Sequence, residues 1–238
     1  MYAAVILIAS FFFTGSRGAV AGEFPPFVPW PERLPIEIQS EVMSVWSRHT
    51  FARAVNGQPA HAPLDLFRLF VDLPEVTVAA ARHLGFGDYT VRQLGSASYQ
   101  VEDSEGARGT YRVLAQDAHR RLILASGSRP GWIFGRIEGA SLTLLTFSPE
   151  PSADGRPRVA QRLETLVRID NRVAAFSIRI LLPIFSRYAD RKIAEGFSIT
   201  ARVSSWAHEN PKTFCRWFSR QTKGAFYRTE LAAYCSRA

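Results

Sequence analysis

The sequence has little of what enzymes use to build recognisable motifs. Its 238 residues include five scattered histidines and two cysteines. It contains no Gly-x-Ser-x-Gly nucleophile elbow, no phosphate-binding loop and no paired-histidine zinc motif. The sequence therefore predicts no catalytic residue, no metal site and no cofactor. Whether the protein is an enzyme stays open, and a binding protein is the preferred interpretation.

Lysine is also scarce, since the 29 basic residues include lysine only at positions 192, 212 and 223. The formal net charge is nevertheless +8, and basic proteins can bind nucleic acids, anionic membranes or acidic ligands. The arginines form no dense run, so the sequence does not predict a nucleic-acid partner. An anionic membrane surface is a candidate partner, and nothing in the sequence predicts an oligomeric state.

No uncharged apolar run is long enough to cross a bilayer as a helix, which takes about 20 residues. Residues 2–13 are apolar, and Ala19-Val20-Ala21 follows shortly after them. This pattern is typical of a secretory signal peptide, although no Lys or Arg precedes it. We expect residues 1–21 to be removed and the protein to be exported to the periplasm or the extracellular space. The alternatives are a buried first helix and an uncleaved anchor, which would leave the protein membrane-associated.

Both cysteines lie near the C-terminus, at Cys215 and Cys235. An even number of cysteines in an exported protein is typical of a disulfide. Metal ligation is the alternative, but no histidine lies at a matching spacing. We therefore expect a Cys215–Cys235 disulfide that closes a tail at residues 211–238. This tail is basic and aromatic, so it either packs on the main domain as a helical cap or lies on an anionic membrane.

Five prolines at residues 24–35 predict an extended, proline-rich arm, which we assign to residues 22–35. Phe24, Phe27 and Trp30 lie among these prolines and need a surface to cover. We expect the arm to lie on its own domain. A docking peptide for a partner protein is the alternative.

Residues 36–210 read as a single α+β domain of ordinary globular composition, with 47% hydrophobic and 21% charged residues. In its first part, apolar residues recur at helical spacing. They predict helices at about 35–48, 63–73 and 76–84, with a short strand at 49–55. Pro74 separates the second helix from the third.

Seven segments with the pattern of short strands follow, separated by turn signals such as Glu138-Gly139. They cover residues 89–94, 97–102, 109–115, 120–126, 132–137, 141–148 and 158–169. Trp132 and Phe134 in the fifth segment either pack in the core or rim a pocket. Short consecutive strands with tight turns predict an antiparallel meander.

The pattern becomes helical at Asn171 and stays helical to about His208. Pro183 should kink or restart this helix. Residues 173–185 are apolar nearly all round, so we expect this half to be the most deeply buried. Ala189 and Gly196 lie on the apolar seam and leave room for a close backbone approach.

The order of two helices, a meander of six or seven strands and a long C-terminal helix resembles the START-like helix-grip superfamily. That superfamily includes lipid transfer domains and polyketide cyclase/dehydratase-like proteins. The resemblance covers about residues 49–208 and rests on element order. It implies an antiparallel meander sheet wrapped around the C-terminal helix, with an apolar ligand held between them. The N-terminal helix and the cysteine-closed tail are additions to the family pattern.

This resemblance implies a lining for the ligand site, from the long helix and from the strands. The expected residues are Phe176, Ile180, Ile184, Phe185 and Ala189 of the helix, with Leu144 and Leu163 of the strands. Thr143, Gln161 and Thr165 would provide the few polar anchors that apolar pockets have. We expect an exported soluble protein that binds an apolar or lipid-like ligand. The alternatives are a cyclase- or hydrolase-like enzyme that uses the same cavity, and a structural or interaction module with a filled core.

Overall fold

The computed structural model describes residues 24–29, 31–131, 135–221 and 229–237. The predicted signal peptide at residues 1–21 lies outside them. The elements, in chain order, are η1 (Pro31–Arg33), α1 (Ile36–Ser47), β1 (Phe51–Asn56), α2 (Leu64–Asp72), α3 (Pro74–His83), β2 (Tyr89–Gly95), β3 (Ser98–Asp103), β4 (Arg108–Gln116), β5 (Arg120–Gly131), β6 (Gly135–Pro149), β7 (Val159–Ile169), α4 (Arg172–Glu209), α5 (Pro211–Arg220) and α6 (Thr229–Cys235).

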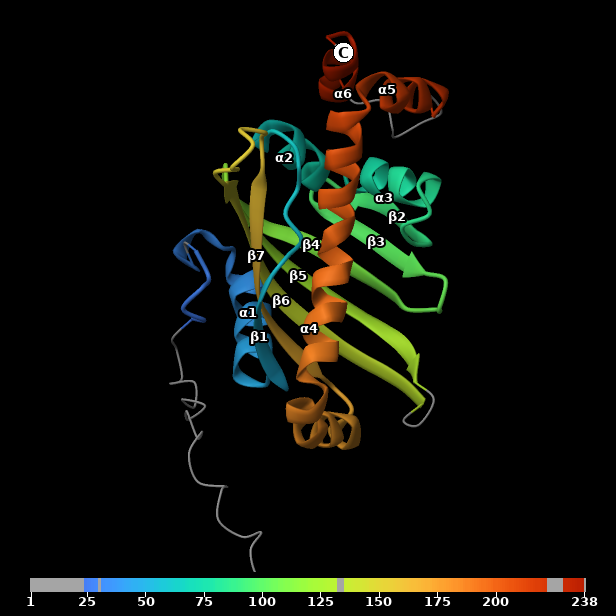
Figure 1. The fold of residues 1–238 in the computed structure, drawn as a ribbon. Coiled ribbons are helices and arrows are strands. Elements are labelled where there is room, and N and C mark those ends of the chain that lie inside the picture. Colours follow the sequence, from blue (N-terminus) through green and yellow to red (C-terminus); the bar gives the residue numbers. More distant parts are fainter. Residues whose placement is uncertain (1–23, 30, 132–134, 222–228, 238) are drawn as a thin grey trace, which may run out of the picture.

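The strands form one antiparallel sheet of seven strands, in the order β1-β7-β6-β5-β4-β3-β2. Strands β2 to β7 each pair with their neighbours in sequence, which is the predicted meander. The first strand joins the far edge and aligns Phe51 with Val167. The long helix α4 crosses the face that the sheet curves around (Figure 1). The fold is therefore α+β and of the helix-grip type, as the sequence predicted.

The predicted turn at Glu138-Gly139 is wrong, because β6 runs through these residues without a break. Gly139 lies opposite Gly127 in the ladder between β5 and β6. A Cβ atom on Gly127 would lie 2.6 Å from the carbonyl oxygen of Arg108, and one on Gly139 would overlap the carbonyl oxygen of Arg168. These glycines are therefore required by close contact between strands. Residues 132–134 of the predicted fifth strand lie outside the described residues.

The C-terminal helix is a single element of 38 residues that continues through Pro183. Its first turns, at the bottom of Figure 1, run at an angle to the rest of the helix, as expected for a helix that contains a proline. Its last turns pack against α2, α3 and the C-terminal helices. The buried residues of this cluster include Leu66, Phe70, Val76, Ala80, Ile199, Val203, Ala207, Phe214 and Leu231.

The expectation that the first half of α4 is the most deeply buried is wrong where the structure describes its side chains. Val173 and Phe176 are 65% and 66% exposed, whereas Val203 and Ala207 near the other end are fully buried. The reason is length. A helix of this size is about 57 Å long. The preceding strand β7 spans only about 37 Å. One end of α4 must therefore extend past β7, and α2 and α3 fix the C-terminal end against the domain.

The opposite face of the sheet is covered by α1 and the proline-rich arm. Val42 and Val45 of α1 are fully or almost fully buried there, and Val28 and Leu34 of the arm join them. On the sheet side the cluster consists of Leu122, Leu124, Leu142, Leu144 and Leu166. The described part of the arm thus lies on its own domain, as expected.

The tail packs as a helical cap. Cys215 and Cys235 form the predicted disulfide, with Cα atoms 5.5 Å apart. Phe214 and Trp217 of α5 face inward and are at most 8% exposed, and Phe214 lies edge-on to Trp206 of α4 with ring centroids 5.6 Å apart. These aromatic side chains are therefore not available to a membrane surface. Phe226 and Tyr227 of the tail lie outside the described residues.

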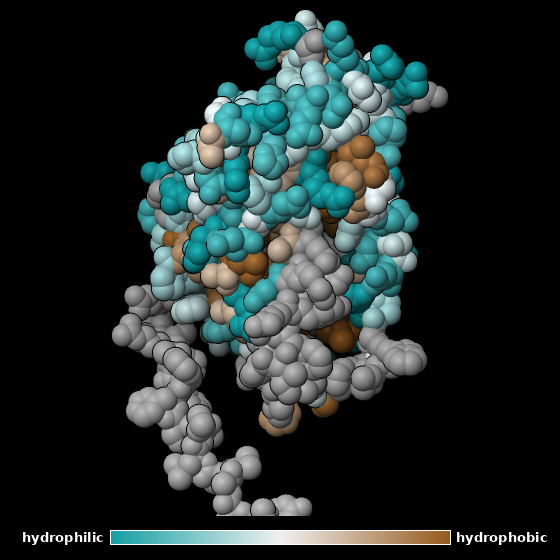
Figure 2. Space-filling view, in the orientation of Figure 1, coloured by the Kyte–Doolittle hydropathy of each residue, from teal (hydrophilic) through white to brown (hydrophobic). Residues whose placement is uncertain are grey.

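The face of the molecule that carries α4 is mainly hydrophilic where it is coloured (Figure 2). Hydrophobic residues appear on it in small, separate groups. Within the described ranges, no helix is both long enough and apolar enough to cross a membrane.

Candidate functional site

A cavity of about 970 Å³ lies between the curved face of the sheet, α2, α3 and the C-terminal half of α4. Strands β2 to β7 all contribute lining residues, whereas α4 contributes Ile193, Gly196, Phe197, Ile199 and Thr200. Pro74, Thr77 and Val78 of α3 close one side.

At the centre of the sheet, several residues that line this cavity are smaller than their neighbours on the opposite face. Strand residues alternate between faces, so neighbours in sequence can be compared directly. Ile123 and Ala125 line the cavity, whereas Leu122 and Leu124, which alternate with them, pack under α1. Thr143 and Thr165 likewise line it beside Leu142 and Leu166. Alanine and threonine at these positions leave space that leucine fills on the other face.

Two charged residues line the cavity within the described part of the chain, and they bind each other. Arg121 of β5 is 3% exposed, and its Nε and one terminal nitrogen each donate to a carboxylate oxygen of Asp72 at 2.8 Å. Its other terminal nitrogen donates to the carbonyl oxygens of Arg120, at 2.8 Å, and Asp117. The guanidinium also lies 5.4 Å from the ring centroid of Phe147. This arrangement ties β5 to the end of α2.

The floor of the cavity carries a pair of hydroxyl groups. Thr143 of β6 and Thr165 of β7 are direct cross-strand partners, and their hydroxyl oxygens are 2.8 Å apart. Both residues are buried, at 6% and 5% exposure. Ile123 continues the same row on β5. The pair therefore lies beside an apolar side chain on β5, and Ser141 is the preceding lining residue on β6.

Aromatic rings line the cavity on β3 and β4, across β5 from the hydroxyl pair. Tyr99 and Tyr111 are cross-strand partners on β3 and β4, and their rings stack with centroids 4.9 Å apart. Burial, with the neighbouring Tyr99 and the carboxylate of Glu75, raises the pKa of the Tyr111 hydroxyl well above its usual range. The hydroxyl therefore stays protonated and can act as a hydrogen-bond donor, but not as a base near neutral pH.

Gly196 of α4 leaves room in front of the sheet. A Cβ atom added there would meet no atom within 4 Å, and the residue lines the cavity. The sequence suggested that this glycine allows a close backbone approach, and that interpretation is wrong. Its missing side chain leaves part of the cavity open in front of the sheet.

The structure places the described lining residues that the resemblance implied in different parts of the molecule. Leu144 lies on the opposite face under α1 and does not line the cavity, because it is one residue out of phase with Thr143. Leu163 is fully buried beside the cavity, against Phe67 and Phe147. Phe176 is exposed near the start of α4. Of these candidates, none is among the described lining residues.

The side chains of Ile180, Ile184, Phe185 and Ala189 lie outside the described part of α4, so their role in the lining stays a prediction. Among the suggested polar anchors, Thr143 and Thr165 do line the cavity. Gln161 instead donates to the carbonyl oxygen of Gln58 at 2.6 Å, beside the first strand. The two tyrosines were missed. Their position on the inward phase of β3 and β4, opposite each other, was the available signal.

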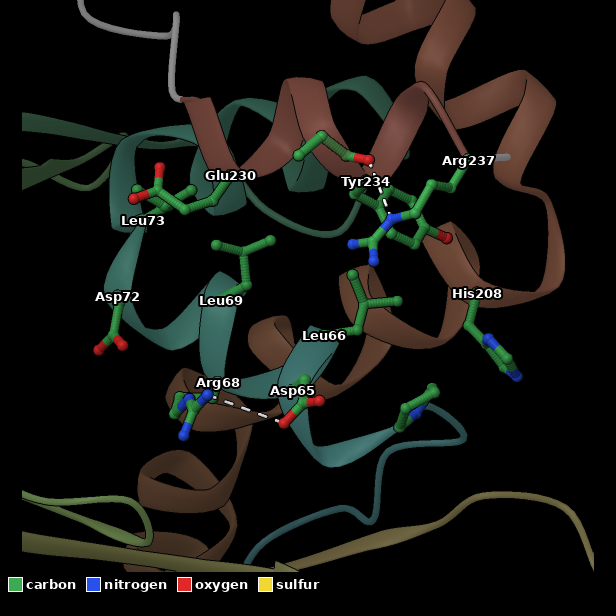
Figure 3. A pocket seen from close by; sticks show the side chains of 12 residues that line it. Asp65, Leu66, Arg68, Leu69, Asp72, Leu73, His208, Glu230, Tyr234 and Arg237 are labelled. Carbon is green, nitrogen blue, oxygen red and sulfur yellow. Dashed lines mark hydrogen bonds and ion pairs between the residues drawn. The ribbon is translucent and has the colours of Figure 1, made fainter.

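A second, smaller hollow of about 610 Å³ lies between α2, the end of α4 and α6 (Figure 3). Leu66 and Leu69 of α2 point toward α6 across it. Its rim is charged, and Asp65 and Arg68 form an exposed ion pair at 3.7 Å. Exposed pairs of this kind contribute little free energy. The larger cavity, with its apolar walls and buried polar groups, is the better candidate for a ligand site.

Among the residues that the structure describes, no group of three or more His, Cys, Asp or Glu side chains is arranged to hold a metal ion.

Comparison with known proteins finds similar solved structures but no similar sequence family. No protein-family model matches the chain, and no curated protein matches it. An uncharacterized protein from Rhizobium leguminosarum is 15% identical with a TM-score of 0.38, over 65% of this chain and 93% of its own. Truncated norcoclaurine synthase from Thalictrum flavum is 12% identical with a TM-score of 0.37, over 64% of this chain and 94% of its own.

Proposed function

We propose that this protein binds an apolar or lipid-like small molecule in the cavity between the sheet and the C-terminal half of α4. The observation that carries the proposal is the difference between the two faces of the sheet. The centre of one face is filled with leucine, while the other face carries smaller residues such as Ala125, Thr143 and Thr165 beside about 970 Å³ of space. Small-molecule sites are typically concave, mostly apolar and supplied with a few polar groups, at volumes of about 300–1,000 Å³.

A structural module with a filled core is the weaker alternative. Such a protein would place large side chains where α4 faces the sheet, because unfilled space in a core costs stability. Gly196, which lines this region and would have no atom within 4 Å of an added Cβ, supports the opposite. A helix-interior glycine is also about 1 kcal/mol less favourable than alanine, so a role for the space explains its presence better than helix formation does.

An enzyme that uses the same cavity is the second alternative. The observation in its favour is the buried Tyr111 hydroxyl, which stays protonated and could donate a hydrogen bond to a reacting oxygen. Catalysis of proton transfer also needs a base. The charged groups of the described lining, Arg121 and Asp72, are already bound to each other. Ligand binding therefore requires fewer additional assumptions than catalysis.

We also propose that the protein is exported. The Cys215–Cys235 disulfide supports this, because disulfides persist in oxidising compartments. The apolar segment at residues 2–13 is the second support. Sequencing the N-terminus of protein recovered from outside the cytoplasm should show that residues 1–21 are absent. Protein that still begins at Met1, or that carries two free thiols when unfolded without reductant, would contradict export in this form.

Native mass spectrometry of protein purified from its own cells, without detergent, tests the ligand proposal. We expect a bound small molecule that is released by organic solvent and that partitions into the apolar phase. Protein that carries no molecule, and that takes up no fluorescent apolar probe afterwards, would contradict the proposal and favour the structural module.

A further inference from the structure

We propose that the cavity selects an uncharged ligand that carries a neutral oxygen group, an alcohol or a ketone, and that the hydroxyl pair of Thr143 and Thr165 binds this oxygen. The inference rests on the proposed function and names the chemical class of its ligand. It excludes fatty-acid anions and long-chain amines, which are equally apolar along their chains but end in a charge.

The first step concerns charge. A carboxylate or an ammonium group that enters an apolar cavity needs an opposite charge, because an unpaired buried charge is costly. Arg121 and Asp72 are the charged residues of the described lining. Two hydrogen bonds of 2.8 Å join them, and two backbone carbonyl oxygens accept from the remaining terminal nitrogen of Arg121. The pair is neutral overall, so it offers neither a carboxylate nor an ammonium group a net opposite charge.

Arg53, on the strand beside Thr165, is also ion-paired. Arg53 is the cross-strand neighbour of Thr165 on β1. Its Nε lies 3.2 Å from a carboxylate oxygen of Asp190 on α4, and one of its terminal nitrogens donates to the carbonyl oxygen of Ala52 at 2.9 Å. The polar row of the floor therefore ends in an ion pair whose facing atoms, Arg53 Nε and an Asp190 carboxylate oxygen, make no hydrogen bond to the described residues. A neutral ligand leaves both ion pairs intact.

The second step concerns unused hydrogen-bonding capacity. Two threonine hydroxyls have two hydrogens and four lone pairs between them. The bond between Thr143 and Thr165 uses one hydrogen and one lone pair. One hydrogen of the pair therefore has no partner among the described residues, and Ile123, the cross-strand neighbour of Thr143, is apolar. Buried hydroxyls are normally hydrogen-bonded, so a ligand oxygen that accepts from this pair would complete it.

Tyr111 supports the same conclusion from the opposite wall. Its hydroxyl makes no hydrogen bond to the described part of the chain and stays protonated, since burial raises its pKa. It too offers a donor to a neutral oxygen. A cavity whose spare polar groups are hydroxyls matches alcohols and ketones better than charged head groups.

The experiment compares three ligands with the same ten-carbon chain at pH 7: decanol, decanoate and decylammonium. Each displaces a fluorescent apolar dye from the full chain with its disulfide intact. We expect decanol to bind at least tenfold more tightly than either ion. The variant T143V/T165V should weaken decanol about fivefold to tenfold, the value of about one hydrogen bond, and leave dye affinity unchanged.

Thr146→Val on the same strand is the matched control, because Thr146 lies in the opposite phase and outside the lining. It should leave all three affinities unchanged. Equal or tighter binding of decanoate or decylammonium would overturn the inference while leaving the proposed function in place. An equal loss for decanol and the dye in T143V/T165V would overturn the role of the hydroxyl pair. A chain that binds neither dye nor decanol would overturn the proposed function itself.

Discussion

The two faces of the sheet are built from the same strands but are packed differently. Under α1 and the arm, Leu142 and Leu166 are at most 2% exposed and contact other leucines. On the face toward α4, their neighbours Thr143 and Thr165 line open space. The difference shows that side-chain size at alternate strand positions contributes to the space on the face toward α4. Four predictions test this comparison, from the largest expected effect to the smallest.

Shortening a side chain should cost more on the filled face than on the cavity face. We expect Leu142→Ala to reduce the free energy of unfolding by about 2–5 kcal/mol, since it creates a hole in a packed cluster. Ile123→Ala should cost only about 1–2 kcal/mol, because that side chain already borders space. Urea unfolding of both variants provides the comparison. Equal losses would mean that the face toward α4 is packed solid.

Removing one partner of the Arg121–Asp72 ion pair should destabilise the protein, whereas replacing both partners with apolar residues should cost little. Arg121→Met leaves Asp72 without its partner. Because the Asp72 side chain is 40% exposed and can be rehydrated, we expect a loss of about 2 kcal/mol, below the 3–5 kcal/mol of a fully buried pair. Adding Asp72→Leu should recover most of this loss in urea unfolding. A double variant no more stable than Arg121→Met would contradict the assigned pairing.

Replacing glycine with alanine should raise the free energy of unfolding at one glycine and lower it at another. Gly196→Ala on α4 should raise the free energy of unfolding by up to about 1 kcal/mol, because alanine favours the helix and its Cβ meets open space. Gly139→Ala should lower it, because the Cβ would overlap the Arg168 carbonyl oxygen. Thermal unfolding measures both. A loss of stability in Gly196→Ala would indicate that no space lies in front of α4.

The fall of the free energy of unfolding at high pH should depend on Tyr111. Its pKa is raised in the folded protein, so its contribution is fully present below the unfolded value of about 10 and is lost as pH rises above that. Tyr111→Phe should therefore make stability fall less steeply at high pH. Urea unfolding across pH 8 to 11 checks this. An unchanged slope would place the Tyr111 hydroxyl in contact with water.

Much of the fold could be predicted from the sequence, because each element carries its own period. The alternation of strand residues, the helical spacing after Asn171 and the prolines at 63 and 74 located the main elements. The turn at Glu138-Gly139 failed for a physical reason. A glycine interrupts the strand pattern in the sequence both when it forms a turn and when it lies in a strand close to a neighbouring backbone. Only the pairing of Gly139 with Gly127 in the sheet distinguishes the two cases.

The site was harder to predict than the fold. Apolar residues on both sides of a strand look alike in sequence, so Leu144 was placed in the cavity although it packs under α1. Register decides which phase faces inward, and register depends on long-range pairing. The same limit applied to burial along α4. The apolar first turns looked like the core, but the contacts that bury α4 come from α2 and α3 at its other end.

Uptake of a fluorescent apolar probe by the wild-type chain, Gly196→Ala and Gly196→Phe tests the central claim most directly. The account predicts saturable uptake by the wild type, unchanged or slightly reduced uptake in Gly196→Ala, and at least a tenfold loss in Gly196→Phe. Circular dichroism should show the same fold in all three, because the larger side chain enters existing space. Equal uptake by Gly196→Phe and the wild type, with the fold intact, would contradict a ligand site between the sheet and α4.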